Sequence, residues 1–167
     1  MAQSNAIPFR MPFGIPGDLS RMAGQATVKA EVYGATAFPA YGIPCKLSSQ
    51  TVIPLAVVGD TAPYGWLVRP FPTQGVNASD PLGTSVPATT GVANVLLRGY
   101  ISVNVQFGAT SVVEGGTVYM RYANATGAEI IGGIEGSSVG GSNVALTGCY
   151  FTGPCDSAGN TEVAVNI

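Results

Sequence analysis

Apolar and polar side chains alternate along the segment 95–107, and this is the clearest pattern in the chain. Most odd-numbered positions are apolar and most even-numbered positions are polar. A period of two places successive side chains on opposite faces of a strand. The apolar face comprises Val95, Leu97, Ile101, Val103, Val105 and Phe107, and the other face comprises Arg98, Tyr100, Ser102, Asn104 and Gln106. We therefore predict one long strand with one face in the core.

The segment 27–33 repeats the alternation, so we expect Val28, Ala30 and Val32 to face the core. The turn Glu114-Gly115-Gly116 predicts an antiparallel hairpin between 95–107 and 117–122. Clusters of Gly, Pro, Ser, Asn and Asp separate the remaining short strands, which we expect at 43–47, 51–58, 64–69, 128–134, 143–151 and 161–166. Roughly eight or nine such strands are typical of a β-sandwich or a jelly roll.

Composition supports an all-β chain. The 167 residues include 23 Gly and 12 Pro, which disfavour long helices. There are 19 valines and 8 leucines, a ratio that favours strands because β-branched side chains pack well on a pleated surface. The length favours one domain. We expect residues 18–167 to form a single-domain, jelly-roll-like β-sandwich, preceded by an extended N-terminal arm over residues 1–17.

The arm is predicted from prolines that recur at every fourth position from Pro8 to Pro16, with Phe9 and Phe13 between them. Fully extended, such a segment reaches roughly 55 Å, which is more than the body of a small domain. It can therefore contact something beyond its own core. A strap across its own sheet or a frayed terminus is the alternative interpretation.

A second unusual segment is Tyr64-Gly-Trp-Leu-Val-Arg-Pro-Phe-Pro-Thr-Gln74, which holds the only tryptophan, an arginine and two prolines. We expect Trp66 in the core and the residues from Arg69 onward in a contact surface, because Tyr, Trp and Arg are enriched at binding hot spots. The stretch 70–94 is too long for a plain connection between strands. The candidate contact residues are Phe9, Phe13, Arg69, Pro70, Phe71, Pro72, Thr73 and Gln74.

Several classes of chemistry are disfavoured. The chain has no histidine, which excludes Ser-His-Asp and Cys-His catalysis, and we predict no enzyme activity, no cofactor and no metal site. A formal charge of −2 with 7 basic residues provides no cationic surface for nucleic acid. No apolar stretch approaches the ~20 residues of a membrane span, so no membrane association is expected. The cysteines are expected as reduced thiols, although Cys149 and Cys155 could close a small loop.

Four further pieces of sequence carry a resemblance: Ile15-Pro-Gly-Asp-Leu-Ser-Arg21, Gly59-Asp-Thr before the Tyr64–Gln74 segment, Gly116-Thr-Val-Tyr-Met-Arg-Tyr122, and Glu162-Val-Ala-Val-Asn-Ile167. With them, the chain resembles the structural cement proteins of tailed bacteriophages. The resemblance runs from about Gly14 onward, and its most specific piece is Leu-Val-Arg-Pro-Phe-Pro-Thr-Gln. It implies a non-enzymatic decoration protein, made in the host cytoplasm, on the outer surface of the virion capsid.

The same resemblance implies the partners. The protein would bridge major capsid proteins of the HK97-like fold, as a homodimer, and its arm would lie on a neighbouring capsid subunit or on the partner protomer. The low share of charged residues, 10%, suits a surface that neighbours cover. Two alternatives stay open: another virion β-protein such as a tail or fibre component, or a carbohydrate-binding module. An enzyme would require a glycosidase-like carboxylate pair in a cleft.

Overall fold

The computed structural model describes residues 14–21, 23–57, 59–70 and 85–167. Within these ranges the chain forms nine strands and two short 3-10 helices, η1 (Ala23–Gln25) and η2 (Ala109–Ser111). The all-β class is therefore confirmed. The strands are β1 (Thr27–Tyr33), β2 (Pro44–Ser48), β3 (Thr51–Pro54), β4 (Gly65–Val68), β5 (Val92–Phe107), β6 (Thr117–Arg121), β7 (Ile134–Glu135), β8 (Asn143–Phe151) and β9 (Asn160–Val165).

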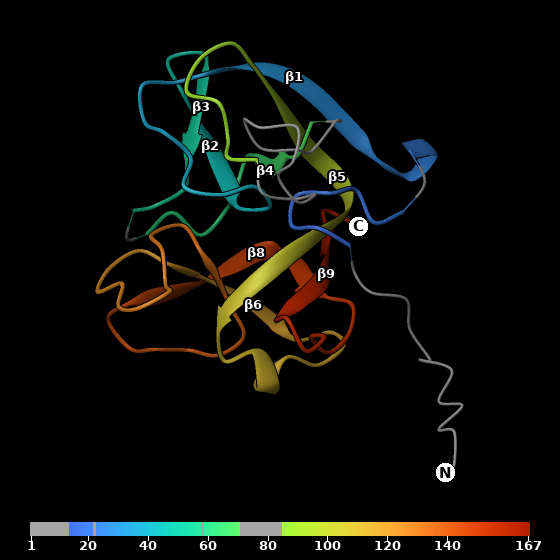
Figure 1. The fold of residues 1–167 in the computed structure, drawn as a ribbon, viewed down its shortest axis with the longest axis vertical. Coiled ribbons are helices and arrows are strands. Elements are labelled where there is room, and N and C mark those ends of the chain that lie inside the picture. Colours follow the sequence, from blue (N-terminus) through green and yellow to red (C-terminus); the bar gives the residue numbers. More distant parts are fainter. Residues whose placement is uncertain (1–13, 22, 58, 71–84) are drawn as a thin grey trace.

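Strand β5 is the element on which the fold is built. Its first half pairs with β1 and β4, and β2 and β3 complete a closed ring of five strands, in the order β1-β3-β2-β4-β5. Its second half pairs with β7 and β9, and β6 and β8 complete a second ring. Figure 1 shows the two rings as two lobes, with β5 running from one into the other. This order does not confirm a jelly roll.

The change of ring occurs where β5 is irregular. The β1–β5 register shifts between Thr27 and Val28, opposite Leu97. Gly99 follows at φ +136°, in a region that side chains rarely adopt, and the pairing with β9 starts there. A bulge bends and twists a strand, so these residues turn β5 toward the second ring. Because of this bend, Val95 packs in the core of the first ring, whereas Ile101 packs in a second core cluster.

Strand β4 separates the two core clusters. All four of its residues are buried, because its two faces contact different cores. Trp66 and Val68 join the larger cluster, which contains most of the buried side chains of the second ring, and Leu67 joins the cluster inside the first ring. Trp66 is fully buried, which confirms its predicted place in the core. The lobes are therefore packed against each other through one continuous apolar cluster.

Three predictions about strands are wrong. Strand β6 does not pair with β5, because β7 lies between them, parallel to β5 and antiparallel to β6. The hairpin predicted through Glu114-Gly115-Gly116 is therefore absent. The strand predicted at 128–134 is reduced to Ile134–Glu135, and the one predicted at 51–58 ends at Pro54. Beyond Pro54 one backbone bond continues the pairing with β2, from Leu55 N to Pro44 O at 3.0 Å.

The orientation of β1 is also opposite to the prediction. Val28 and Val32 are 41% and 52% exposed, so the apolar face of the strand lies on the outside of the ring. The opposite face carries Lys29 and Glu31, which are joined by an ion pair of 2.7 Å. Tyr64 Oη donates a further hydrogen bond to Glu31 Oε1 at 2.6 Å. These contacts satisfy the polar groups of the face that alternation alone assigned to solvent.

Candidate contact surface

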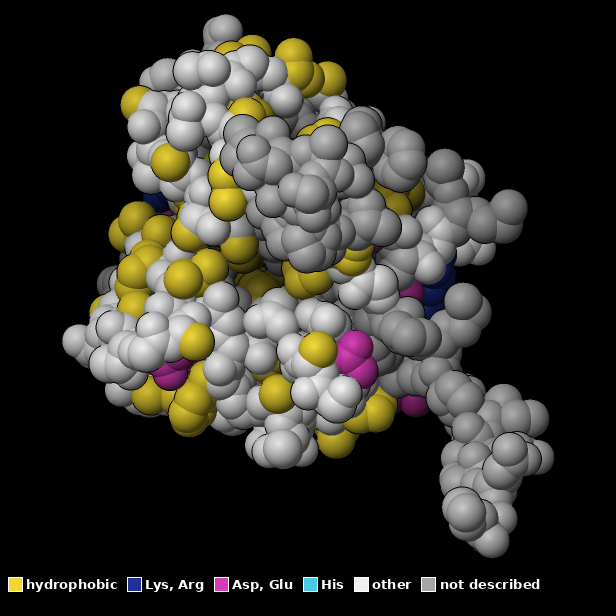
Figure 2. Space-filling view, in the orientation of Figure 1, with side chains coloured by type: hydrophobic (Ala, Val, Ile, Leu, Met, Phe, Trp, Pro, Cys, Tyr) yellow, Lys and Arg dark blue, Asp and Glu magenta, His cyan; other side chains and the backbone are white. Residues whose placement is uncertain are grey.

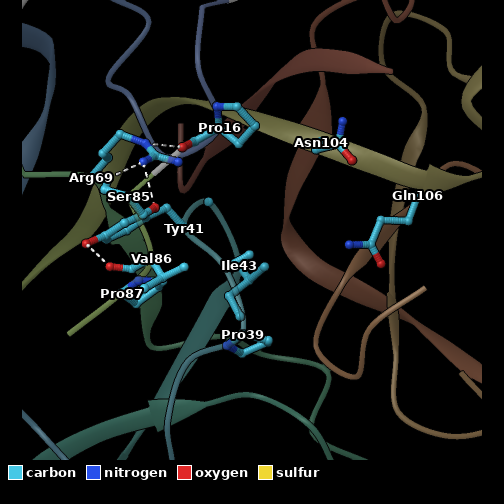
Figure 3. A pocket seen from close by; sticks show the side chains of 12 residues that line it. Pro16, Pro39, Tyr41, Ile43, Arg69, Ser85, Val86, Pro87, Asn104 and Gln106 are labelled. Carbon is cyan, nitrogen blue, oxygen red and sulfur yellow. Dashed lines mark hydrogen bonds between the residues drawn. The ribbon is translucent and has the colours of Figure 1, made fainter. Parts of the chain in front are cut away.

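Arg69 lies directly after β4, at the seam between the two lobes (Figure 3). Its Nε donates to Pro16 O at 2.9 Å, and its Nη1 donates to Ser85 O at 3.1 Å and to Ser85 Oγ at 2.6 Å. The guanidinium lies over the ring of Tyr41, 4.5 Å from its centroid. Arg69 therefore joins the base of the N-terminal segment to both flanks of the stretch 71–84.

Residues 17–20 run along β5 as an irregular extra strand. Gly17 N donates to Ser102 O at 2.8 Å, Ser102 N donates to Asp18 O at 2.9 Å, and Ser20 N donates to Tyr100 O at 3.2 Å. The close approach depends on glycine, since a Cβ on Gly17 would lie 2.5 Å from Tyr41 Cβ. This segment is part of the hydrogen-bonded body, and the N-terminal residues before it start from a fixed point.

Glu162 on β9 fixes the end of this segment, residues 17–20, which we call the strap. It accepts hydrogen bonds from Ser20 Oγ at 2.6 Å and Thr152 Oγ1 at 2.7 Å. Arg21 donates from Nε at 3.2 Å and from Nη2 at 2.7 Å. Burial opposes ionisation of the carboxyl group, but these donors outweigh it and hold the pKa of Glu162 below its ordinary value. The Arg21 guanidinium also covers the Tyr100 ring at 3.5 Å.

The predicted contact residues fall into two groups in the structure. Arg69 is buried and hydrogen-bonded within the chain, and Pro70 after it is exposed. Phe9, Phe13 and the run from Phe71 to Gln74 lie outside the described residues. The structure nevertheless brings together the points at which both predicted contact segments join the body, because Arg69 contacts Pro16 and Ser85 at once.

Two hollows follow the seam between the lobes. The first, of about 240 Å³, is lined by Pro16, Tyr41, Arg69 and Pro87 on one side and by Asn104 and Gln106 on the other (Figure 3). The second, of about 410 Å³, is mostly apolar and includes Ile130 and Ile131. Pro39 lines both hollows, so they lie next to each other, and Figure 2 shows hydrophobic side chains along this seam. Neither hollow contains a pair of carboxylates, as a glycosidase would require.

Most charges of the described residues are paired within the chain. Burial lowers the pKa of Arg69 and raises that of Asp18, although the two charges attract each other. Arg98 is exposed and has no ion-pair partner among the described residues. The surface therefore offers hydrogen bonds and apolar contacts more than charge. The ion pairs are Arg21–Glu162, Lys29–Glu31, Lys46–Asp60, Arg121–Glu129 and Arg121–Glu135.

The described residues contain no cluster of three or more His, Cys, Asp or Glu side chains that could hold a metal ion. Within the same ranges, no helix is long and apolar enough to cross a membrane. Cys45, Cys149 and Cys155 are free thiols. Burial raises the pKa of Cys45 and Cys149 to about 12 and that of Cys155 to about 11, so none is an activated nucleophile.

Sequence reasoning missed the apolar strip on the outside of the first ring. Val32 and Val92 are register partners on neighbouring strands, 52% and 67% exposed, and Val28 and Ala30 continue the strip along β1. The alternation in 27–33 is the available signal, but alternation alone does not say which face of the strand is buried. Tyr41 and Pro39, which line the seam, gave no signal because single aromatic and proline residues are common in loops.

A family model described as "Structural cement protein (E217 gp24/Pam3 gp6)" matches residues 2–166. A chain from a solved structure entitled "The capsid of Myoviridae Phage XM1" has a similar fold, with a TM-score of 0.65 and 22% sequence identity. The alignment covers 99% of this chain and 98% of that one. No curated protein sequence matches significantly.

Proposed function

Because the chain belongs to the structural cement protein family of bacteriophage capsids, we propose that it binds the outer surface of the assembled head and bridges neighbouring major capsid proteins of the HK97-like fold. In this role it acts as a homodimer and carries out no catalysis. The observation that carries the proposal is the family match over nearly the whole chain.

The seam geometry supports a bridging role. The N-terminal segment and the stretch 71–84 join the body at the same place, where Arg69 contacts Pro16 and Ser85. Two contact segments that share one fixed base can reach two neighbouring subunits while the body stays rigid. Phe9, Phe13 and the residues Pro70 to Gln74 are the proposed contacts. The two seam hollows offer a further surface, which is mostly apolar in the second hollow.

The physical mechanism needs binding alone. A ligand that binds only the assembled lattice stabilises it by RT ln(1 + [L]/Kd). When one segment is bound, the second meets its site at a high effective concentration, so avidity exceeds the affinity of either contact. Ordering an extended segment lowers the net affinity but allows it to cover surface that a rigid domain does not reach.

The test is co-sedimentation of the purified protein with cement-stripped heads of its phage, with bound copies counted per major capsid subunit and head rupture followed on heating. We expect saturable binding and a higher rupture temperature. A variant lacking residues 2–14 should keep the folded β body, checked by circular dichroism, and should bind more weakly. Unchanged binding of this variant would exclude the arm contact. Absence of binding by the full chain would favour a tail, fibre or glycan-binding role.

A further inference from the structure

Strand β1 has an open backbone edge beside its exposed apolar face. Tyr33 N donates to Gly91 O next to β5, and Gly34 N donates to Val52 O in β3. Backbone groups alternate sides along a strand, so those of Val28 and Ala30 point away from β5. On that side β3 pairs with β1 only at Val32 and Tyr33, and within the described residues no other strand covers the edge.

Lys29, the side chain of β1 that could discourage pairing at this edge, is held by other contacts. Lysine on an edge strand discourages pairing with another chain. Lys29 is the only lysine of β1, and its ammonium group is held by Glu31 at 2.7 Å and by Tyr64 Oη at 3.3 Å, on the face of β1 opposite to the valines. The outer face keeps Val28, Ala30 and Val32, and Figure 2 shows hydrophobic side chains reaching the surface over β1.

The size of this strip indicates the kind of occupant. Specific interfaces between globular proteins bury about 800 Å² on each partner, which is far more than three valines and an alanine supply. An open edge beside a narrow apolar face suits one extended segment, added to the sheet as a further strand. Such a segment needs apolar side chains at every second position.

Residues 7–13 of this chain have that pattern. Ile7, Phe9, Met11 and Phe13 alternate with Pro8, Arg10 and Pro12. In an extended strand the four apolar residues share one face and direct their N–H and C=O groups to one edge. The two prolines stand on the opposite edge, where their missing donors cost nothing if that edge faces solvent. When such a strand is antiparallel to β1, the residues that bond its edge also place their side chains on the valine face.

The direction of the described chain before Leu19 disfavours pairing of residues 7–13 with β1 of the same copy. Residues 17–20 run antiparallel to β5, from Ser102 near Gly17 to Tyr100 near Ser20. From Ser20 back toward Gly14, the chain therefore runs alongside the half of β5 that belongs to the second ring. Strand β1 pairs with the other half, residues 92–98, so the chain leaves in the direction opposite to β1.

We infer that the open edge of β1 receives residues 7–13 of a second copy as an added antiparallel strand. The inference builds on the proposed self-association, and it identifies which parts meet. On a head surface, exchange of these segments would link neighbouring copies to one another as well as to the capsid.

The experiment uses the full chain with the photoreactive residue benzoylphenylalanine in place of Phe9, mixed as ¹⁴N-labelled and ¹⁵N-labelled copies. Crosslinking is done both in free solution and on cement-stripped heads, and the joined peptides are identified by mass spectrometry. We expect peptides of mixed isotope that join residue 9 to the 27–33 region. Links confined to one isotope, links to other surfaces, or no links in either state would overturn the inference.

Two variants sharpen the result. Ala30→Pro removes an edge N–H that does not bond β5, and we expect the mixed-isotope yield to fall about five- to tenfold, the effect of one or two lost hydrogen bonds. Val32→Asp should lower the yield likewise, whereas Val113→Asp, at a site 59% exposed elsewhere, should leave it unchanged. Equal yields in Ala30→Pro and wild type would contradict the pairing. Because the free protein is measured too, failure of head binding remains distinguishable from failure of this inference.

Discussion

Among the described contacts, we expect loss of the hydrogen bonds to the Glu162 carboxylate to have the clearest effect on stability. It accepts four hydrogen bonds, from Ser20, Arg21 and Thr152, and its side chain is only 9% exposed. Replacing it by glutamine keeps the shape and removes the charge. The variant tests whether the strap over β5 depends on this charge.

The size of the stability loss can be worked out from the groups that donate hydrogen bonds to Glu162. A hydrogen bond to a charged group contributes about 1.5–3 kcal/mol, but the Arg21 side chain is 44% exposed and water replaces part of what it loses. We therefore expect Glu162→Gln to lower the free energy of unfolding by about 2–3 kcal/mol, which for a chain of this length lowers Tm by roughly 4–12 °C. Thermal unfolding followed by circular dichroism measures this change at pH 7.

The pH dependence supplies a second readout. The pKa of Glu162 lies below its ordinary value of 4.5, so its stabilisation is complete above that pH and is lost as the pH falls through the folded-state pKa. The difference between wild type and Glu162→Gln should therefore shrink in acid. Asp60→Asn is the matched control, because the Asp60 carboxylate, paired with Lys46, is 35% exposed, and its loss should cost less than about 1 kcal/mol. A Glu162→Gln variant as stable as wild type, or a difference that is constant down to acid pH, would refute the reasoning.

Further outcomes are expected at three residues. Trp66→Ala should destabilise the protein by about 3–5 kcal/mol in chemical denaturation, because the side chain is fully buried between the lobes. Trp66→Phe should cost less, since the indole N–H has no hydrogen-bond partner in the described structure. Gly42→Ala should lower Tm, because φ is +74° and a Cβ would lie 2.8 Å from Gly17 N and 2.9 Å from Ser102 O; a Tm equal to that of wild type would argue against this packing. The Cys45 thiol should react with a disulfide reagent at pH 8 only after unfolding, since burial raises its pKa to about 12, and prompt labelling of the native protein would contradict its burial.

The sequence predicted the strands better than their partners. Alternation located β1 and β5 because it depends on local geometry alone. It could not show that β1 turns its valines outward, since that depends on the contacts of Lys29 and Glu31 with Tyr64, which is distant in the sequence. Nor could it show the bend at Gly99, because a glycine in a strand marks a bulge without saying which way the strand then runs.

The contact surface was predictable in part. Residue types indicated that the region around Arg69 is unusual, and the family resemblance indicated the kind of partner. The sequence did not reveal that Arg69 is buried, because arginine at that position fits a binding surface equally well. Arg69 holds the two segments together by donating hydrogen bonds to Pro16 and Ser85, and no motif around either residue predicts these contacts.

Because β5 belongs to both rings, the fold has a high contact order. Lys29 pairs with Val95, and Ile101 pairs with Val163, so each ring closes only between residues more than 60 positions apart. Pairings of such range fold slowly, on a timescale of about milliseconds to seconds. A nascent chain that ends before β9 holds β5 with one side unpaired, and such an edge is prone to aggregate. The second ring therefore closes only once β9 has left the ribosome, because β9 pairs with both β5 and β8.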